Sequence, residues 1–144
     1  MPQNLTMHDH LVIETRADLS KLEDVLDRIE SFGASQRWSD GLQFQVRLVL
    51  EEYIVNIISH GSKSQVVPEL KIMLTQTSVQ LELMVADNGM AFDPLQAAHP
   101  NLDMSLDERA IGGLGVHLMR QMMDQFTYQR DGEWNRLLST KALV

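Results

Sequence analysis

The spacing of hydrophobic positions along this chain changes between a helical and a strand-like period, and these periods predict its elements. A capping box, Ser20-x-x-Glu23, precedes apolar residues at helical spacing, and Gly33 is placed to end that helix. A second helix is predicted from about Gly41 to Ser59. Alternating apolar and polar residues predict strands elsewhere, at Leu11–Thr15, Glu69–Gln76, Ser78–Ala86, Phe126–Arg130 and Trp134–Leu143.

The order of these elements predicts an α+β fold, with helices on one face of a mostly antiparallel sheet in a two-layer sandwich. A further helix is expected to begin at Gly112–Gly115, before a closing hairpin around Asp131-Gly132. Residues 11–144 would form a single domain behind a flexible tail at 1–10. The stretch at about 94–111 has neither period, and connections of this length are usually functional or disordered. We therefore expect a lid there.

Composition narrows the classes of function. The chain has 144 residues and a mass of 16.4 kDa, which suits one domain, and its formal charge is −8. This acidic balance argues against nucleic acid or an anionic membrane as a partner, because both attract clustered Lys and Arg. The chain has no cysteine, no apolar run near the roughly 18 residues of a membrane span, and no signal-peptide core at its start. We therefore expect a cytoplasmic protein.

The second helix carries two polar residues between apolar arcs. Glu52 and Asn56 are four residues apart, so they share one side of the helix. They form either a surface or satisfied buried pair, or they direct a carboxylate and an amide into a pocket. In such a pocket a hard cation would find oxygen ligands. Neighbouring Glu51 lies on another side of the helix, and we expect it in solvent.

Asp87 stands at the end of the Ser78–Ala86 strand. It continues the inward alternation of that strand, which comprises Val79, Leu81, Leu83 and Val85. An inward carboxylate is costly unless something donates hydrogen bonds to it. One reading is an Asx turn, in which Asp87 caps its own loop at Asn88-Gly89. The other is an acceptor for an amine donor on a ligand, such as the amino group of adenine.

The glycines of Gly112-Gly113-Leu114-Gly115 precede the last predicted helix. Glycine allows a backbone to approach a ligand closely, and the free N–H groups of a helix N-terminus attract anions. A flexible hinge is the alternative interpretation. The sequence contains no GxxxxGK[ST] motif, which excludes a P-loop, and no GxGxxG spacing, which argues against a Rossmann site.

Taken in order, the three boxes are Glu52-x-x-x-Asn56, then Asp87-x-Gly89-x-x-Phe92-Asp93-Pro94, then Gly113-Leu114-Gly115. This order resembles the nucleotide site of the GHKL superfamily of ATPases and histidine kinases. The second and third boxes look like its anti-sigma factor serine/threonine kinase branch, and the segment from Asp124 to Lys141 is similar to the closing strands of that branch. The resemblance implies a Bergerat-type fold, with helices layered on a mixed sheet.

The resemblance also implies a role for each matching residue. ATP would be bound with Mg²⁺ on Asn56 and with its adenine amino group on Asp87, while Gly89 lets the base lie close. Glu52 would be the general base that takes a proton from the attacking hydroxyl. The ATP-binding set further includes Phe92, Leu114 and the phosphate-contacting Gly113 and Gly115.

Two other residues carry over less directly. Arg109 is the only basic residue between Pro94 and Ile111, so it is the candidate for the lid side chain that relatives place on the terminal phosphate. A solvated loop charge is the alternative interpretation of Arg109. His60 follows Asn56 by one helical turn, and we expect it to pack rather than to catalyse.

The function that the resemblance implies is an ATP-dependent protein serine/threonine kinase in transcription regulation. It would phosphorylate an anti-sigma factor antagonist and sequester a sigma factor or other target by partner switching, and dimers are common in the branch. One alternative is a non-catalytic ATP-binding partner-switching module, which the presence of Glu52 disfavours. The other is a fragment related to a sensor histidine kinase. It is disfavoured because the roughly 20–25 residues before Glu23 are too few for a dimerising helix pair.

Overall fold

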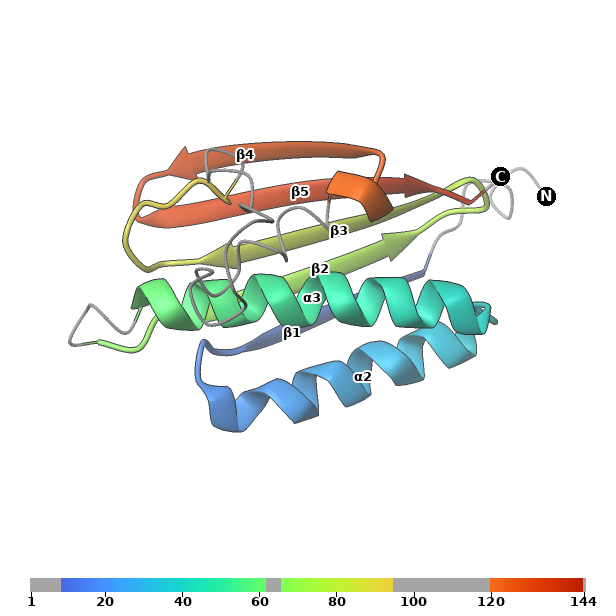
Figure 1. Cartoon of the computed structure of the whole chain (residues 1–144), viewed down its shortest axis with the longest axis horizontal. Helices are drawn as coiled ribbons and strands as arrows, with labels where there is room; N and C mark the ends of the chain where they lie inside the picture. Colours follow the sequence, from blue (N-terminus) through green and yellow to red (C-terminus); the bar gives the residue numbers. More distant parts are fainter. Residues whose placement is uncertain (1–8, 62–65, 95–119, 144) are drawn as a thin grey trace, which may run out of the picture.

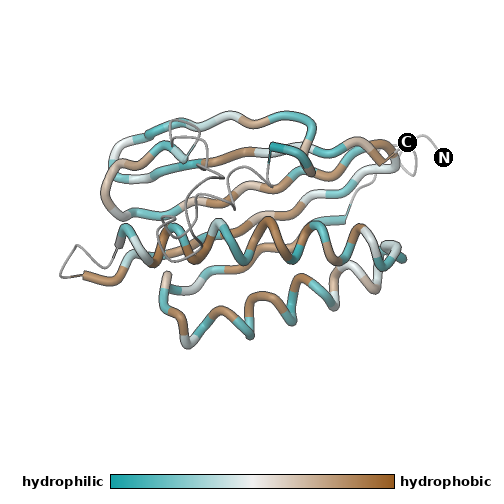
Figure 2. Tube along the Cα trace, viewed as in Figure 1, coloured by the Kyte–Doolittle hydropathy of each residue, from teal (hydrophilic) through white to brown (hydrophobic). Residues whose placement is uncertain are grey.

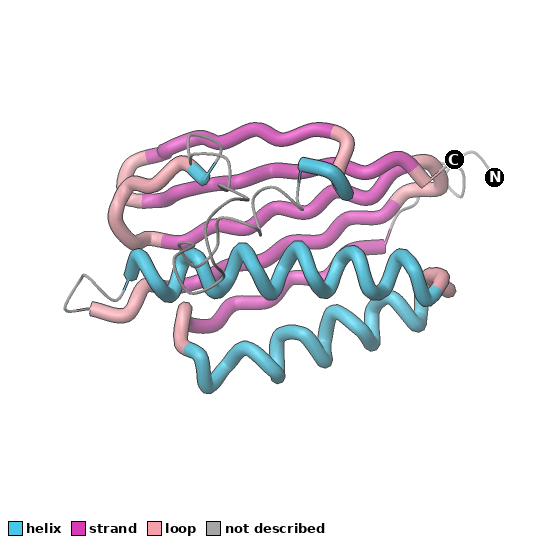
Figure 3. The backbone as a smooth tube through the Cα atoms, viewed as in Figure 1, coloured by secondary structure: helices cyan, strands magenta, loops and turns pink. Residues whose placement is uncertain are grey.

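The computed structural model describes residues 9–61, 66–94 and 120–143 of the chain. Helices and strands follow one another along it in the predicted order (Figures 1 and 3). The elements are β1 (Asp9–Arg16), the short 3-10 helix η1 (Leu19–Lys21), α2 (Leu22–Ser35), α3 (Asp40–Gly61), β2 (Glu69–Gln76), β3 (Gln80–Asp87), β4 (Gln125–Asp131) and β5 (Trp134–Ala142). The helix predicted after the glycines is described only at its end, where residues 120–122 are helical.

The five described strands form one sheet in the order β1-β2-β3-β5-β4. Every neighbouring pair in it is antiparallel, so the mixed sheet that the resemblance implied is wrong for the described strands. Tight turns join β2 to β3 and β4 to β5. A tight turn reverses the chain direction, so the two strands that it joins pair antiparallel. The pairing of β3 with β5 sets Asp87 opposite Asn135.

Helices α2 and α3 lie side by side along the sheet, which makes the predicted two-layer α+β sandwich (Figure 1). Hydrophobic and hydrophilic positions alternate along the strands, as Figure 2 shows. The inward positions of the strands meet apolar side chains of both helices in one core. Fully buried members include Ile13, Ile29, Leu50, Ile54, Ile72, Leu74 and Leu81. Burial of one such side chain stabilises the fold by about 1.5–3 kcal/mol, so this layer is what holds the helices on the sheet.

Both ends of α2 differ from the prediction. Ser20 does not cap the helix: it lies within η1, where its N–H donates to Asp18 Oδ1 at 2.9 Å. Asp18 caps η1, because its extended backbone precedes that short helix, whereas Lys21 is the N-cap of α2 and makes no side-chain cap hydrogen bond. Gly33 does not end α2, which continues to Ser35. A Cβ on Gly33 would overlap the Trp38 ring, so this glycine is needed for close packing.

Three further details differ from the prediction: one element boundary and the exposure of two side chains. The tail expected at 1–10 is too long, because β1 begins at Asp9 and pairs with β2 from there. Val79 is 54% exposed rather than inward, because the Thr77 hydroxyl accepts the N–H groups of Val79 and Gln80 in a turn before β3 begins. Phe44 is 61% exposed, although the apolar surround of α3 suggested burial. It lies beside Arg47 in a shallow groove between α2 and α3.

Candidate functional site

Four of the predicted site residues line one small cavity: Asn56, Asp87, Gly89 and Phe92. It lies between the second half of α3, the end of β3 with the loop after it, and the start of β5. Its volume is about 10 Å³, which is room for at most one water molecule. The lining residues are Tyr53, Asn56, Ile57, His60, Asp87, Gly89, Met90, Phe92 and Asn135.

Asp87 is the buried carboxylate of this cavity, with 5% of the residue exposed. One of its oxygens, Oδ2, accepts the Gly89 N–H at 3.0 Å and the Asn135 Nδ2 at 3.1 Å. Among the described residues, no donor bonds the other oxygen, Oδ1. The Asx turn considered for Asp87 is therefore present, yet it uses only one oxygen. The second oxygen remains as a buried acceptor, which suits an N–H donor of a ligand.

Burial raises the pKa of Asp87 above its ordinary value. The hydrogen bonds from Asn135 and Gly89 oppose this shift, and so do the nearby charges of Arg130 and His60. Desolvation disfavours the charged form, whereas donors and cations favour it. The donors and cations around Asp87 thus offset part of the desolvation that burial imposes on its charged form.

Gly89 closes the loop after β3 against its neighbours. A Cβ at this position would lie 3.0 Å from Asp87 Oδ2 and 3.1 Å from Pro68 Cγ, so only glycine fits without a shift. Arg130 holds the loop from the other side by donating Nη1 to the Gly89 carbonyl at 2.8 Å. Asn88, which lies between Asp87 and Gly89 in the sequence, accepts the Glu69 N–H through its side-chain oxygen at 2.7 Å. These contacts position Gly89 for close approach to whatever Asp87 binds.

Asn135 is the site residue that the sequence reasoning missed. It is 2% exposed, on the inward face of β5, directly opposite Asp87 in the β3–β5 pair. The available signal was the alternation of β5, in which Asn135 shares the inward face with Leu137. An inward polar residue on a strand is costly unless it is hydrogen-bonded, so the sequence carries the same signal at Asn135 as at Asp87.

Asn56 and Glu52 occupy different places, although both were predicted in the site. Asn56 is 3% exposed and lines the cavity. Glu52 is half-buried and does not line it, because four residues along a helix amount to about 6 Å of rise. Burial, followed by the neighbouring Glu51 charge, raises the pKa of Glu52. Glu51 itself is half-buried rather than fully in solvent.

The rings of His60 and Phe92 close the cavity. They stack with centroids 3.7 Å apart and an interplanar angle of 28°. His60 therefore packs, as expected, and Phe92 reaches the predicted site through the loop after β3. The other predicted binding residues lie outside the described part of the chain: Arg109, Gly113, Leu114, Gly115 and the lid beyond Pro94.

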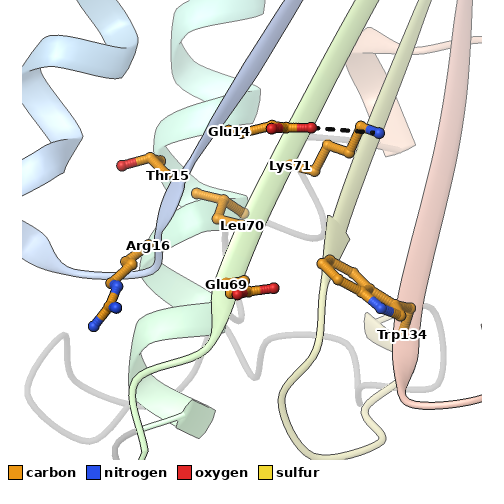
Figure 4. A pocket seen from close by; sticks show the side chains of 7 residues that line it. All are labelled: Glu14, Thr15, Arg16, Glu69, Leu70, Lys71 and Trp134. Atoms are coloured by element: carbon orange, nitrogen blue, oxygen red, sulfur yellow. Dashed lines mark ion pairs between the residues drawn. The ribbon is translucent and has the colours of Figure 1, made fainter.

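A larger hollow of about 440 Å³ is lined by the end of β1 and the start of β2 on one side of β3, and by the start of β5 on the other (Figure 4). It is lined by Glu14, Thr15, Arg16, Glu69, Leu70, Lys71 and Trp134. Its ion pair joins Lys71 to Glu14 at 3.7 Å between exposed side chains, which contributes little. Buried polar groups converge in the smaller cavity instead, so the candidate site is there.

No cluster of three or more His, Cys, Asp or Glu side chains suited to a metal ion occurs among the described residues. None of their helices is long and apolar enough to cross a membrane.

Comparison with known proteins identifies the domain. Residues 15–141 match the family model of the histidine kinase-like ATPase domain. The serine/threonine-protein kinase BtrW of Bordetella bronchiseptica is 37% identical over 128 residues, which cover 89% of this chain and 90% of BtrW. The serine-protein kinases RsbW of Bacillus cereus (strain AH187) and Bacillus anthracis are 32% identical over 102 residues. That match covers 68% of this chain and 62% of each RsbW.

These matches confirm the resemblance that the Asp87 and Gly113 boxes suggested, and the family match spans every described element from the end of β1 to β5. The chain therefore belongs to the histidine kinase-like ATPase family, in the branch that includes the serine/threonine-protein kinase BtrW and the serine-protein kinase RsbW.

Proposed function

We propose that this protein binds ATP in the cavity around Asp87 and transfers its terminal phosphoryl group to a serine or threonine of a separate protein. The prediction of a protein kinase is confirmed by BtrW and RsbW, which are named as such. The observation that carries the ATP site is Asp87 Oδ1, which accepts no hydrogen bond from the described residues and lies beside a glycine that permits close approach. The substrate would be an anti-sigma factor antagonist, and the kinase would also sequester a sigma factor or another target.

Base recognition would follow from the polarity of the cavity. The exocyclic amino group of adenine would donate to Asp87 Oδ1. Guanine would instead place a carbonyl oxygen there, so that two hydrogen-bond acceptors would face each other. The cavity of about 10 Å³ is too small for a purine. Admission of a base therefore requires the Phe92 ring to move off His60, against which it is stacked.

The donor set also fits Mg²⁺ in part. Asn56 lines the cavity with an amide, and amide oxygens are ligands that hard cations accept. Mg²⁺ bound there would neutralise phosphate charge during transfer. Gly113, Leu114 and Gly115 are proposed to contact the phosphates and Arg109 the terminal one, on the family resemblance alone.

Glu52 would act as the general base. Its carboxylate takes the proton of the substrate hydroxyl as the hydroxyl oxygen forms a bond to the terminal phosphorus. The bond from that phosphorus to the bridging oxygen breaks, and ADP leaves with the electron pair. A base works best when its pKa lies near the working pH. Burial raises the pKa of Glu52 above its ordinary value, which moves that pKa toward neutral pH.

The decisive experiment incubates the protein with γ-labelled Mg-ATP and candidate antagonist domains. Label on a serine or threonine of the antagonist is the expected result. Label on a histidine of the kinase would instead indicate a sensor histidine kinase fragment. Tight ATP binding without any transfer would indicate a non-catalytic partner-switching module.

The remaining proposals rest on the resemblance and the composition. A formal charge of −8 supports the proposed absence of nucleic-acid and anionic-membrane partners. The cytoplasmic location is proposed from the composition, and the homodimer from the family resemblance. Sedimentation at several protein concentrations tests the homodimer.

A further inference from the structure

The buried amide of Asn135 contacts three separate parts of the cavity wall. Its Nδ2 donates to Asp87 Oδ2 at 3.1 Å and to the Met90 carbonyl at 2.8 Å. Its Oδ1 accepts the Phe92 N–H at 3.2 Å and the Tyr128 hydroxyl at 2.5 Å. All four bonding positions of one amide are thus in use, at a residue that is 2% exposed.

The orientation of this amide follows from its backbone partners. The Phe92 N–H can only donate, so it must face the amide oxygen, and the Met90 carbonyl can only accept, so it must face the NH₂ group. The NH₂ group therefore also faces Asp87, and it occupies the same oxygen as the Gly89 N–H. Since both donors hold Oδ2, Oδ1 is the oxygen left for a ligand.

We propose that Asn135 is the positioning residue of this site, which couples the carboxylate that recognises the base to the loop that must move to admit it. The inference rests on the proposed ATP function. Met90 and Phe92 belong to the loop whose ring closes the cavity on His60. Movement of Phe92 that breaks its bond to Asn135 loosens the same amide that holds Asp87. Loop position and the orientation of Asp87 are therefore linked through one side chain, without contact between Asn135 and the nucleotide.

The first test compares Asn135→Ala with Ser139→Ala. Ser139 is a matched control, because it is equally buried on the inward face of the same strand but does not line the cavity. Calorimetry should show ATP affinity reduced about tenfold or more in Asn135→Ala, the effect of one lost hydrogen bond to a charged group. Ser139→Ala should bind ATP within about twofold of the wild type. Equal effects in the two variants would overturn the proposal.

Amide hydrogen exchange tests the coupling in the protein without nucleotide. In Asn135→Ala the Phe92 and Gly89 amides should exchange faster, because Phe92 loses its acceptor and Asp87 loses one of its two donors. Unchanged exchange at both amides would refute the coupling. This exchange measurement does not require ATP, so it separates two possible failures. Wild-type protein that does not bind ATP would contradict the proposed function, whereas the amide exchange rates of Phe92 and Gly89 would still decide the coupling.

A second variant, Asn135→Asp, covers the case in which Asn135→Ala does not fold. At neutral pH its carboxylate would face Asp87 and the Tyr128 hydroxyl, and the other titratable groups around this pair are Arg130, His60, Tyr53 and Asp93. Protonation of the new side chain restores an O–H donor toward Asp87 Oδ2. ATP affinity of Asn135→Asp should therefore rise several-fold as pH falls from 8 to 6, while the wild type does not gain. A pH profile parallel to that of the wild type would refute the positioning role.

Discussion

Replacement of Asp87 by asparagine should invert the polarity that the cavity presents to a base. Two groups of fixed polarity point at Oδ2, the Gly89 N–H at 3.0 Å and the Asn135 NH₂ at 3.1 Å. In Asp87→Asn the amide oxygen must accept both of them, since an NH₂ group there would face other donors. The new NH₂ group then lies where Oδ1 lies now, and it meets the amino group of adenine as a second donor.

Two losses combine in this variant. A hydrogen bond to a charged acceptor contributes about 1.5–3 kcal/mol, and a buried donor left without an acceptor costs about 1–3 kcal/mol more. Together they predict a loss of ATP affinity between about a hundredfold and ten-thousandfold. The fold itself should survive, because the amide oxygen keeps the hydrogen bonds from Gly89 and Asn135.

Calorimetric titration with ATP and ITP measures this inversion directly. Inosine carries a carbonyl oxygen where adenosine carries the amino group, so the two ligands differ at the atom under test. Wild-type protein should prefer ATP, and Asp87→Asn should prefer ITP. An Asp87→Asn protein that binds ATP within tenfold of the wild type, or that keeps the preference for ATP, would refute the assigned hydrogen bond.

The same substitution should change how the stability of the protein without ligand depends on pH. Because burial raises the pKa of Asp87 above its ordinary 3.8, its stabilising contribution is present below pH 3.8 and is lost as pH rises through the folded-state pKa. The asparagine side chain cannot ionise, so the Asp87→Asn protein should lose less of its free energy of unfolding than the wild type as pH rises from below 3.8 to 7. Chemical denaturation at both pH values measures the two losses. Equal losses in the two proteins would contradict this account.

Three other substitutions test separate parts of the reasoning. Glu52→Gln should leave ATP affinity nearly unchanged and slow phosphoryl transfer by about 10²–10⁴-fold, measured with labelled ATP; full transfer would exclude Glu52 as the base. Gly89→Ala should weaken ATP binding and lower the free energy of unfolding by about 1–3 kcal/mol, because its Cβ meets Asp87 Oδ2 at 3.0 Å. Gly33→Ala should destabilise the fold by a similar amount through the Trp38 ring, with ATP affinity per folded molecule unchanged. Chemical denaturation followed by tryptophan fluorescence measures both losses of stability.

The sequence by itself predicted the order of elements, the two-layer architecture and four of the residues that line the cavity, Asn56, Asp87, Gly89 and Phe92. Periodicity reports which face of an element is apolar, so it placed Asp87 inward on β3 and Asn56 on the same side of α3 as Glu52. The match between the boxes and the family was equally local, because each box lies within one element or one loop. Errors at this level came from single turns and caps, such as Asp18 in place of Ser20 and the turn at Val79.

Only the tertiary structure decided how these residues form a site. The register of β3 against β5 sets Asn135 beside Asp87, and strand register between distant segments cannot be read from the period of either segment. Asn56 lines the cavity and Glu52 does not, because the loop after β3 packs against the later part of α3. The stack of Phe92 on His60 is part of that packing. The sequence identified an inward carboxylate at Asp87, but which of its oxygens is bonded within the described residues depends on two donors, one on the loop after β3 and one on β5.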